Sequence, residues 1–299
     1  MKTDTPLIPV LACALAIFLL SVMDAVMKGL VLGIGVYSTI LWRCTLASVV
    51  AGAAWSTGPR IWPSPRVMKL HVLRAAMVGC VLLLFFWGLA RLPLAEAIAL
   101  SFIAPLIALF MAAVLLGERI RRTAIWASVG GMTGVAIIMA GQLGQSTYND
   151  GALLGIAAVL ASTVFYAYNL ILARQQALVA KPIEISFFQN LALTVILGLA
   201  GPWLAVAAPV ELWPGIAAAT ALSLSGILLM SWAYARAEAQ RLIPMEYTAF
   251  VWAILLGWFM FGEAVGWTTL AGAALIIVGC LIAARTKPEL AEPIEPAGI

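Results

Sequence analysis

Long apolar runs separated by short polar breaks fill most of this sequence. A helix needs about 20 mostly apolar residues to cross the hydrocarbon core of a bilayer. Runs of this kind occupy residues 8–31, 36–55, 71–90, 94–116, 123–141, 151–173, 184–204, 213–235, 242–261 and 266–284. The pattern predicts an all-α integral membrane protein with ten transmembrane helices.

A polar break at residues 142–150 divides these runs into two sets of five. We therefore predict one five-helix unit over residues 1–141 and a second over residues 151–285, joined by that linker. Residues 286–299 are rich in Pro and Glu and contain no apolar run, so we expect a disordered cytoplasmic tail.

Composition and charge agree with a lipid environment. Of the residues, 64% are hydrophobic and 10% are charged, whereas a soluble domain carries about a quarter charged residues. Fourteen of the 17 basic residues fall at the termini or in loops that follow even-numbered runs. Because cytoplasmic loops are enriched in Lys and Arg, we predict a bacterial inner-membrane protein with both termini in the cytoplasm. Since the charge pattern indicates membrane orientation, we expect no nucleic-acid partner.

The sequence contains an internal repeat. A shift of 145 residues aligns the third and fourth runs with the eighth and ninth, and a weaker match at 141 aligns the first with the sixth. The shift of 145 matches Trp87 with Trp232, Arg91 with Arg236, and Gly117-Glu118 with Gly262-Glu263. Because each set holds an odd number of runs, the second must enter the membrane inverted. Inverted repeats are typical of alternating-access transporters, whose site lies near the midplane between the halves.

Several short segments match the sequence pattern of a known family. Two parts of that pattern, at 92–106 and 116–119, have counterparts in the second half at 244–248 and 261–263. The segments are LPLAEAIAL at 92–100, FIAPL at 102–106, LGER at 116–119, PMEYT at 244–248, FGE at 261–263, MDAVMK at 23–28 and Trp42-Arg43. In this order they resemble the EamA branch of the drug/metabolite transporter superfamily, which includes bacterial amino-acid exporters.

The resemblance covers residues 8–285. It implies a basket of ten helices around a central cavity that exports small metabolites, and therefore a transporter rather than an enzyme. We expect the substrate to be a neutral or aromatic amino acid, and lipophilic drugs or cations and nucleosides are the alternative. No metal-ligand spacing or phosphate-binding loop is present in the sequence, so we expect no cofactor. We also expect a monomer or a weak dimer in the lipid bilayer.

Ionisable residues inside the predicted spans are the first candidates for a site, because charges are costly in a membrane. Asp24 and Lys28 lie one turn apart on one face of the first span. We predict either that this face binds the amine and carboxylate of a zwitterion, or that the two side chains form a structural ion pair. Arg43 in the second span either binds a carboxylate or ties its helix to a neighbour.

Prolines mark the fourth and ninth spans. Pro105 predicts a kink, and Pro244 frees backbone carbonyls close to Glu246. Glu246 is therefore a candidate for binding substrate or a proton, with anchoring at the membrane interface as the alternative. Its repeat equivalent Ser101 is a small polar residue that suits a cavity wall.

Aromatic and amide side chains complete the predicted site. Trp87 lies close to a helix end, so it lines either the cavity or the interfacial aromatic belt. Tyr166 and Asn169 lie in the sixth span, where a ring beside polar groups suits an aromatic amino acid.

Other features are predicted to be structural. Glu118 and Glu263 follow a glycine at opposite membrane faces, which indicates anchoring. His71 is placed in the loop before the third span and receives no role. Glycines in the fifth span (Gly130, Gly131 and Gly134) and in the tenth (Gly272 and Gly279) permit close approach of helices, either inside the bundle or at a dimer interface, and we predict packing inside the bundle.

Overall fold

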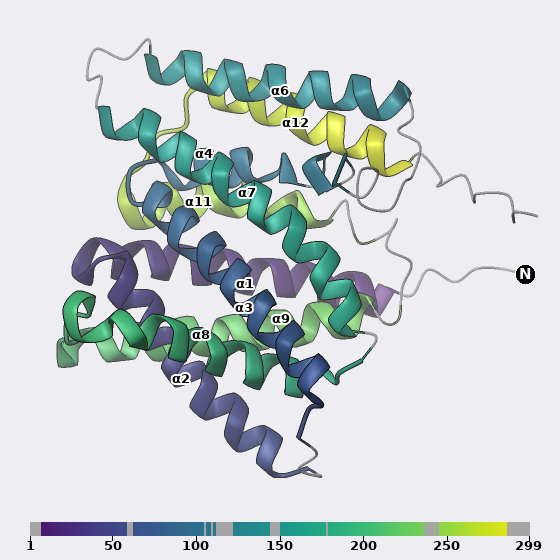
Figure 1. The fold of residues 1–299 in the computed structure, drawn as a ribbon. Coiled ribbons are helices and arrows are strands. Elements are labelled where there is room, and N and C mark those ends of the chain that lie inside the picture. The colour runs from purple at the N-terminus through teal and green to yellow at the C-terminus, as the bar shows by residue number, and fades with distance from the viewer. Residues whose placement is uncertain are drawn as a thin grey trace, which may run out of the picture.

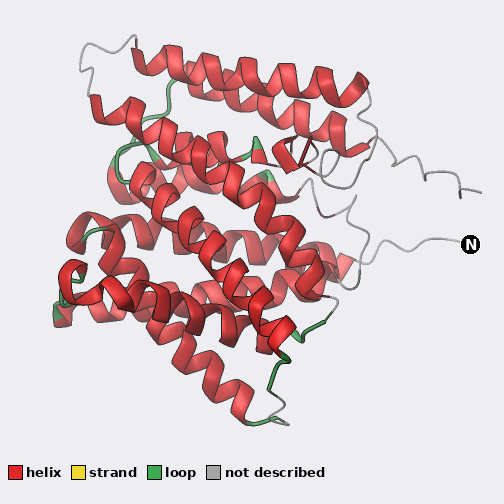
Figure 2. Cartoon of the chain, in the orientation of Figure 1, coloured by secondary structure: helices red, strands yellow, loops and turns green. Residues whose placement is uncertain are grey.

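The computed structural model describes residues 7–58, 62–104, 106–108, 110–111, 122–143, 150–177, 179–234, 236, 242 and 245–285. This part of the chain contains helices, turns and loops but no strand (Figure 2). The helices are α1 (Leu7–Ile34), α2 (Val36–Ser56), α3 (Pro65–Leu89), α4 (Leu94–Ser101), α6 (Arg122–Leu143), α7 (Asp150–Ala177), α8 (Pro182–Leu204), α9 (Trp213–Tyr234), α11 (Thr248–Phe261) and α12 (Trp267–Arg285). A short 3-10 helix, η1 (Val210–Leu212), precedes α9.

Several helices have the length and composition of membrane spans. Among the described residues, six helices are long and apolar enough to cross a bilayer, namely α1, α2, α3, α7, α8 and α9. Shorter apolar helices lie in the regions of α4, α6, α11 and α12. The chain is therefore an all-α, multi-pass membrane protein, and the total of ten spans stays a prediction.

Large apolar side chains cover much of the outside of the bundle. Leu199, Phe259 and Trp267 expose 73%, 82% and 85% of their surface. Soluble proteins rarely expose large continuous apolar patches. Lipid can cover these side chains, while each helix satisfies its own backbone hydrogen bonds. The outer surface thus fits contact with a bilayer.

The helices run back and forth between two ends of the bundle (Figure 1). We name the end where α1 begins the N-terminal end; it also holds the starts of α3, α8 and α11 and the ends of α2, α7 and α9. The opposite end holds the tight turn at Gly35 between α1 and α2 and the end of α11 at Gly262. Their φ angles of 80° and 65° favour glycine at both turns.

The helices of the two halves interleave. Each first-half helix packs mainly against a second-half helix: α1 with α9, α2 with α8, α3 with α7, α4 with α11, and α6 with α12 (Figure 1). In the predicted repeat, α1 corresponds to α7 and α3 corresponds to α9. The α1–α9 and α3–α7 contacts are then equivalent. The other three pairs then join corresponding helices, as a pseudo-two-fold axis requires. The contact pattern is the one expected of a two-fold repeat, and the inversion of the second half stays a prediction.

The fourth and ninth predicted spans, which hold α4 and α11, break at corresponding positions of the repeat. α4 ends at Ser101 and a turn follows at Phe102, while a turn at Tyr247 precedes α11. The prolines that predict these breaks, Pro105 and Pro244, lie outside the described residues. The rings of Phe102 and Tyr247, which are repeat equivalents, meet edge to face with centroids 5.2 Å apart. Equivalent residues touch in this way only close to a symmetry axis.

Two glycines let α6 and α12 approach at backbone distance. A Cβ added at Gly134 would lie 2.5 Å from the carbonyl oxygen of Gly272, and one added at Gly272 would lie 2.5 Å from the carbonyl oxygen of Gly134. Each position also faces an isoleucine of the other helix, Ile276 or Ile138. The two glycines therefore pack inside the bundle, as the sequence predicts.

We expect Gly134→Ala to destabilise the protein, because the new methyl group would meet backbone that cannot move aside. Overpacking of this kind costs about 1–3 kcal/mol, which a thermal unfolding scan of purified protein in detergent would detect. Gly130→Ala is the matched control on the same helix, since a Cβ there meets nothing within 4 Å. Equal melting temperatures for the two variants would contradict the close contact.

Candidate functional site

Lys28 forms an ion pair with Glu263 at the opposite end of the bundle. The ammonium of Lys28 also donates to the carbonyl oxygen of Leu92 at 2.6 Å, and the pair joins the last turns of α1 to the second residue after the end of α11. Glu263 accepts a hydrogen bond from the backbone N–H of Leu94 at 2.7 Å. Only 4% of Lys28 is exposed. This cluster ties α1, the α3–α4 turn and the end of α11 together.

The sequence-based pairing of Lys28 with Asp24 is wrong. Within the described residues, the carboxylate that contacts Lys28 is that of Glu263. Lys28 extends toward the end of its helix, as long basic side chains in membranes do, whereas Asp24 lies one turn deeper. Glu263 fits the predicted anchoring role, although its partner lies 235 residues away in sequence.

Asp24 and Arg43 form a second polar position, in the middle of α1 and in α2. Their charges lie within electrostatic range of each other. The Arg43 guanidinium donates to the hydroxyl of Ser223 on α9 at 3.3 Å and to the sulfur of Cys44 at 3.4 Å. Its buried Nε has no partner in the described part of the chain. Arg43 thus links α2 to α9 and keeps one donor unused.

A third polar cluster lies toward the N-terminal end, between α3, α7 and α8. Arg74 donates through Nε to the amide oxygen of Asn169 at 3.0 Å and through Nη1 to Gln176. The Gln176 amide bonds in turn to Nδ1 of His71. The other ring nitrogen of His71 lies 3.5 Å from a carboxylate oxygen of Glu184. Asn169, a predicted site residue, is thus part of a connected network.

Tyr166 and Glu246 lie next to this cluster. The phenol of Tyr166 is within electrostatic range of both Arg74 and Glu246. The hydroxyl of Tyr234, at the end of α9, donates to the carboxylate of Glu246. Tyr166 is 42% exposed and Glu246 is also exposed. An accessible aromatic ring therefore lies within electrostatic range of both a guanidinium and a carboxylate.

Trp87 and Ser101 lie apart from these charged clusters. The guanidinium of Arg91 stacks 3.4 Å from the Trp87 ring centroid, and Arg236 stacks in the same way on Trp232 at 4.4 Å. Both tryptophans lie close to the ends of their helices, as residues of an interfacial belt do. The hydroxyl of Ser101 donates to the carbonyl of Ala97 within its own helix.

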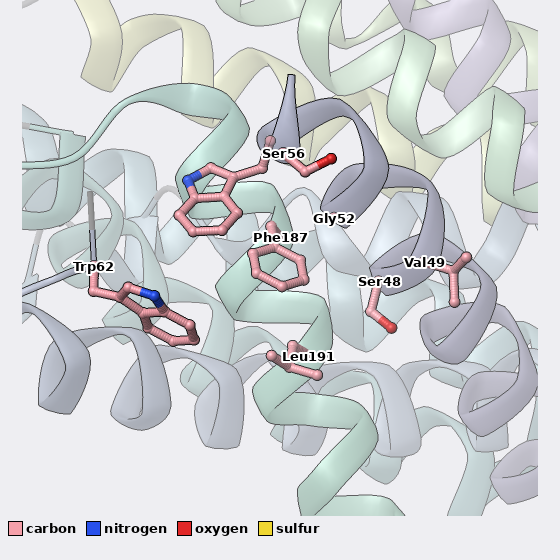
Figure 3. A pocket seen from close by; sticks show the side chains of 8 residues that line it. Ser48, Val49, Gly52, Ser56, Trp62, Phe187 and Leu191 are labelled. Carbon is pink, nitrogen blue, oxygen red and sulfur yellow. The ribbon is translucent and has the colours of Figure 1, made fainter. Parts of the chain in front are cut away.

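Two grooves open on the surface of the bundle. One of about 730 Å³ at the opposite end is lined by Trp87 and Arg91 together with Val31, Gly35, Val36, Tyr37, Leu83, Leu84, Ala90 and Ala158. Another of about 520 Å³ lies between α2 and α8 and is lined by Ser48, Val49, Gly52, Trp55, Ser56, Trp62, Phe187 and Leu191 (Figure 3). The second groove is mostly aromatic and aliphatic and contains none of the predicted site residues.

The sequence analysis missed Arg74, Gln176, Tyr234 and the role of His71. His71 was assigned to the loop before the third span, but α3 begins at Pro65 and His71 is fully buried within it. The spacing of the polar residues carried a signal. Asn169 and Gln176 are seven residues apart, and Arg74 follows His71 by three, so each pair shares a helix face.

The model of the EamA-like transporter family matches residues 7–140 and 153–285. The chain belongs to this family. It is 27% identical over 287 residues to the pseudopaline exporter CntI of Pseudomonas aeruginosa strain PAO1, which covers 93% of this chain and 96% of that protein. It is therefore a transporter of the drug/metabolite type.

Other relatives are named after different substrates. A probable terminal-alkyne amino-acid exporter of Streptantibioticus cattleyicolor is 31% identical over 268 residues, which cover 85% of each chain. A riboflavin transporter of Brucella anthropi is 27% identical over 224 residues, covering 72% of this chain and 76% of that one. A solved crystal structure at 20% identity superposes with a TM-score of 0.62 over 92% of this chain and 96% of that one, and so shares the fold.

Proposed function

We propose that the protein exports small zwitterionic metabolites, with neutral and aromatic amino acids as the main substrates, across the inner membrane by alternating access. The observation that carries this proposal is the position of Tyr166, an accessible ring in a membrane-spanning helix, within electrostatic range of both a cation and a carboxylate. Ligand sites in proteins combine an apolar or aromatic wall with a few polar groups that fix orientation. The names of the pseudopaline and alkyne amino-acid exporters support the direction of transport.

The cluster around Tyr166 suits the binding of substrate from the N-terminal end. Glu246 is placed to bind the substrate ammonium, Tyr234 holds that carboxylate, and the Tyr166 ring offers a stacking surface. With the predicted orientation, this end faces the cytoplasm. Asp24 and Arg43, which lie deeper in the bundle, are the polar positions that the substrate meets next.

The Lys28–Glu263 pair suits the closure of the other side. It joins three segments at the end that the predicted orientation places toward the periplasm. Alternating access requires the two halves to rock around a central site. We infer that the contacts of Lys28 hold the outer side closed while substrate binds from the inside, and that they separate during release.

The proposed function is tested by export from cells. Bacteria that express the protein and are fed a phenylalanine-containing dipeptide should release free phenylalanine into the medium faster than cells with an empty vector. Tyr166→Ala should abolish the difference, and Trp62→Ala, in the groove between α2 and α8, should preserve it. Unchanged amino-acid release with faster release of riboflavin, a nucleoside or a lipophilic cation would replace the proposed substrate with that one.

A further inference from the structure

Arg74 is a charged side chain without a carboxylate partner in the described part of the chain. It lies in α3, a helix long and apolar enough to span a membrane, and is only partly exposed. Its hydrogen-bond acceptors are the neutral amides of Asn169 and Gln176. Charges inside spanning segments are costly and usually face a partner or a cavity that serves transport. Arg74 is therefore a candidate for binding an anion that the described part of the chain does not supply.

The environment of Arg74 holds its guanidinium in a fixed orientation. Two of its nitrogens bond to acceptors on α7, and Gln176 is fully buried and bonded in turn to His71. The His71 ring stacks on Phe188 of α8 with centroids 5.4 Å apart. A guanidinium supported in this way loses little entropy when it binds an anion, because its rotamer is already fixed.

Tyr166 connects this guanidinium to the rest of the proposed site. Its phenol lies within electrostatic range of both Arg74 and Glu246. A substrate stacked on the Tyr166 ring, with its ammonium toward Glu246, would carry its carboxylate toward Arg74. Arginine binds carboxylates through two parallel hydrogen bonds, which add geometric selectivity to affinity.

We propose that Arg74 binds the carboxylate of the transported molecule and so selects α-amino acids over their amides and amines. This inference rests on the proposed function and adds the residue that decides between substrates of similar shape. The amides of Asn169 and Gln176 are positioning groups for Arg74 in this arrangement, and Glu184 acts at a distance through His71.

The test is competition in proteoliposomes that contain purified protein and unlabelled phenylalanine and take up labelled phenylalanine. Wild-type uptake should be inhibited by phenylalanine at least about tenfold more strongly than by phenylalaninamide or phenethylamine, since a hydrogen bond to a charged group accounts for about 10- to 100-fold in affinity. In Arg74→Gln the three competitors should fall within about threefold of one another. Arg74→Lys, which keeps the charge, should retain part of the preference for the acid.

Arg91→Gln is the matched control, because Arg91 is exposed and stacks on Trp87 at the other end of the bundle. It should keep the wild-type preference. Equal inhibition of wild-type uptake by acid and amide would overturn the inference whether or not the Arg74 variants fold. Wild-type preference in Arg74→Gln would overturn it while leaving the proposed function intact. Absence of any amino-acid uptake by the wild type would overturn both.

Discussion

Lys28→Met should lower the melting temperature of the purified protein by about 10 °C. The change leaves the Glu263 carboxylate beside the buried end of α1 without its cation. Removing one partner of a buried ion pair costs about 3–5 kcal/mol, and each kcal/mol shifts the melting temperature of a chain of this size by about 2–4 °C. The leucine carbonyl that accepts from Lys28 also loses its donor.

A double-mutant cycle separates the ion pair from its surroundings. Glu263→Gln alone should also destabilise the protein, because it leaves Lys28 buried and unpaired. The double variant Lys28→Met/Glu263→Gln should recover at least half of the summed loss, since neither charge remains. The exposed Arg91 at the same end provides a control, and Arg91→Gln should change stability by less than about 1 kcal/mol. Strict additivity of the two single changes would show that the pair contributes no coupling.

Glu246→Gln should reduce amino-acid exchange by at least about tenfold while leaving the melting temperature close to that of the wild type. The carboxylate is exposed, so its loss creates no cavity. A charge-assisted hydrogen bond to the substrate ammonium accounts for about 1.5–3 kcal/mol, and 1.4 kcal/mol corresponds to tenfold in affinity. The measurement is the concentration of phenylalanine that gives half-maximal exchange in proteoliposomes.

Two further variants give this prediction its controls. Tyr234→Phe removes the hydroxyl that donates to Glu246 and should have a smaller effect of the same kind. Glu211→Gln, an exposed carboxylate in η1 at the opposite end, should behave as the wild type. If Glu246→Gln and Glu211→Gln exchange phenylalanine equally well, Glu246 does not bind the substrate.

The helices could be predicted from the sequence because lipid imposes a simple rule. Every backbone polar group must be satisfied inside its own helix, so an apolar run of sufficient length becomes a spanning helix. The small residues of the fifth and tenth spans predicted close packing inside the bundle, but not which glycines meet. The break beside Ser101 agrees with Pro105, which has no N–H to donate to the carbonyl four residues earlier.

The partners of the charged residues could not be predicted in the same way. The Lys28–Glu263 pair joins residues 235 positions apart, and no local pattern indicates which carboxylate reaches a given lysine. Asp24 is closer in sequence, but a long lysine side chain can instead reach a carboxylate nearer the membrane interface. Arg74 was missed because it stands at the start of the run predicted at 71–90, where it was counted with the basic residues of the preceding loop, whereas α3 already begins at Pro65.

The sequence also could not predict which candidate residues lie close together in space. Asn169 accepts a hydrogen bond from Arg74, and Tyr166 lies within electrostatic range of both Arg74 and Glu246, so these candidates lie near one another. Asp24 and Arg43 form a second group, and Lys28 belongs to a third. Trp87 and Ser101 join none of them through the contacts described above. Residues from distant segments meet through helix pairing, which apolar patterns alone do not determine.

The central claim is tested most directly by counterflow. Proteoliposomes preloaded with unlabelled phenylalanine should accumulate external labelled phenylalanine transiently, and vesicles without preloading should not. Loss of this exchange in Tyr166→Ala, with retention in Trp62→Ala, is the result that we predict. No counterflow with any neutral or aromatic amino acid, together with exchange of a nucleoside or a lipophilic cation, would contradict the proposed substrate while leaving the transporter fold in place.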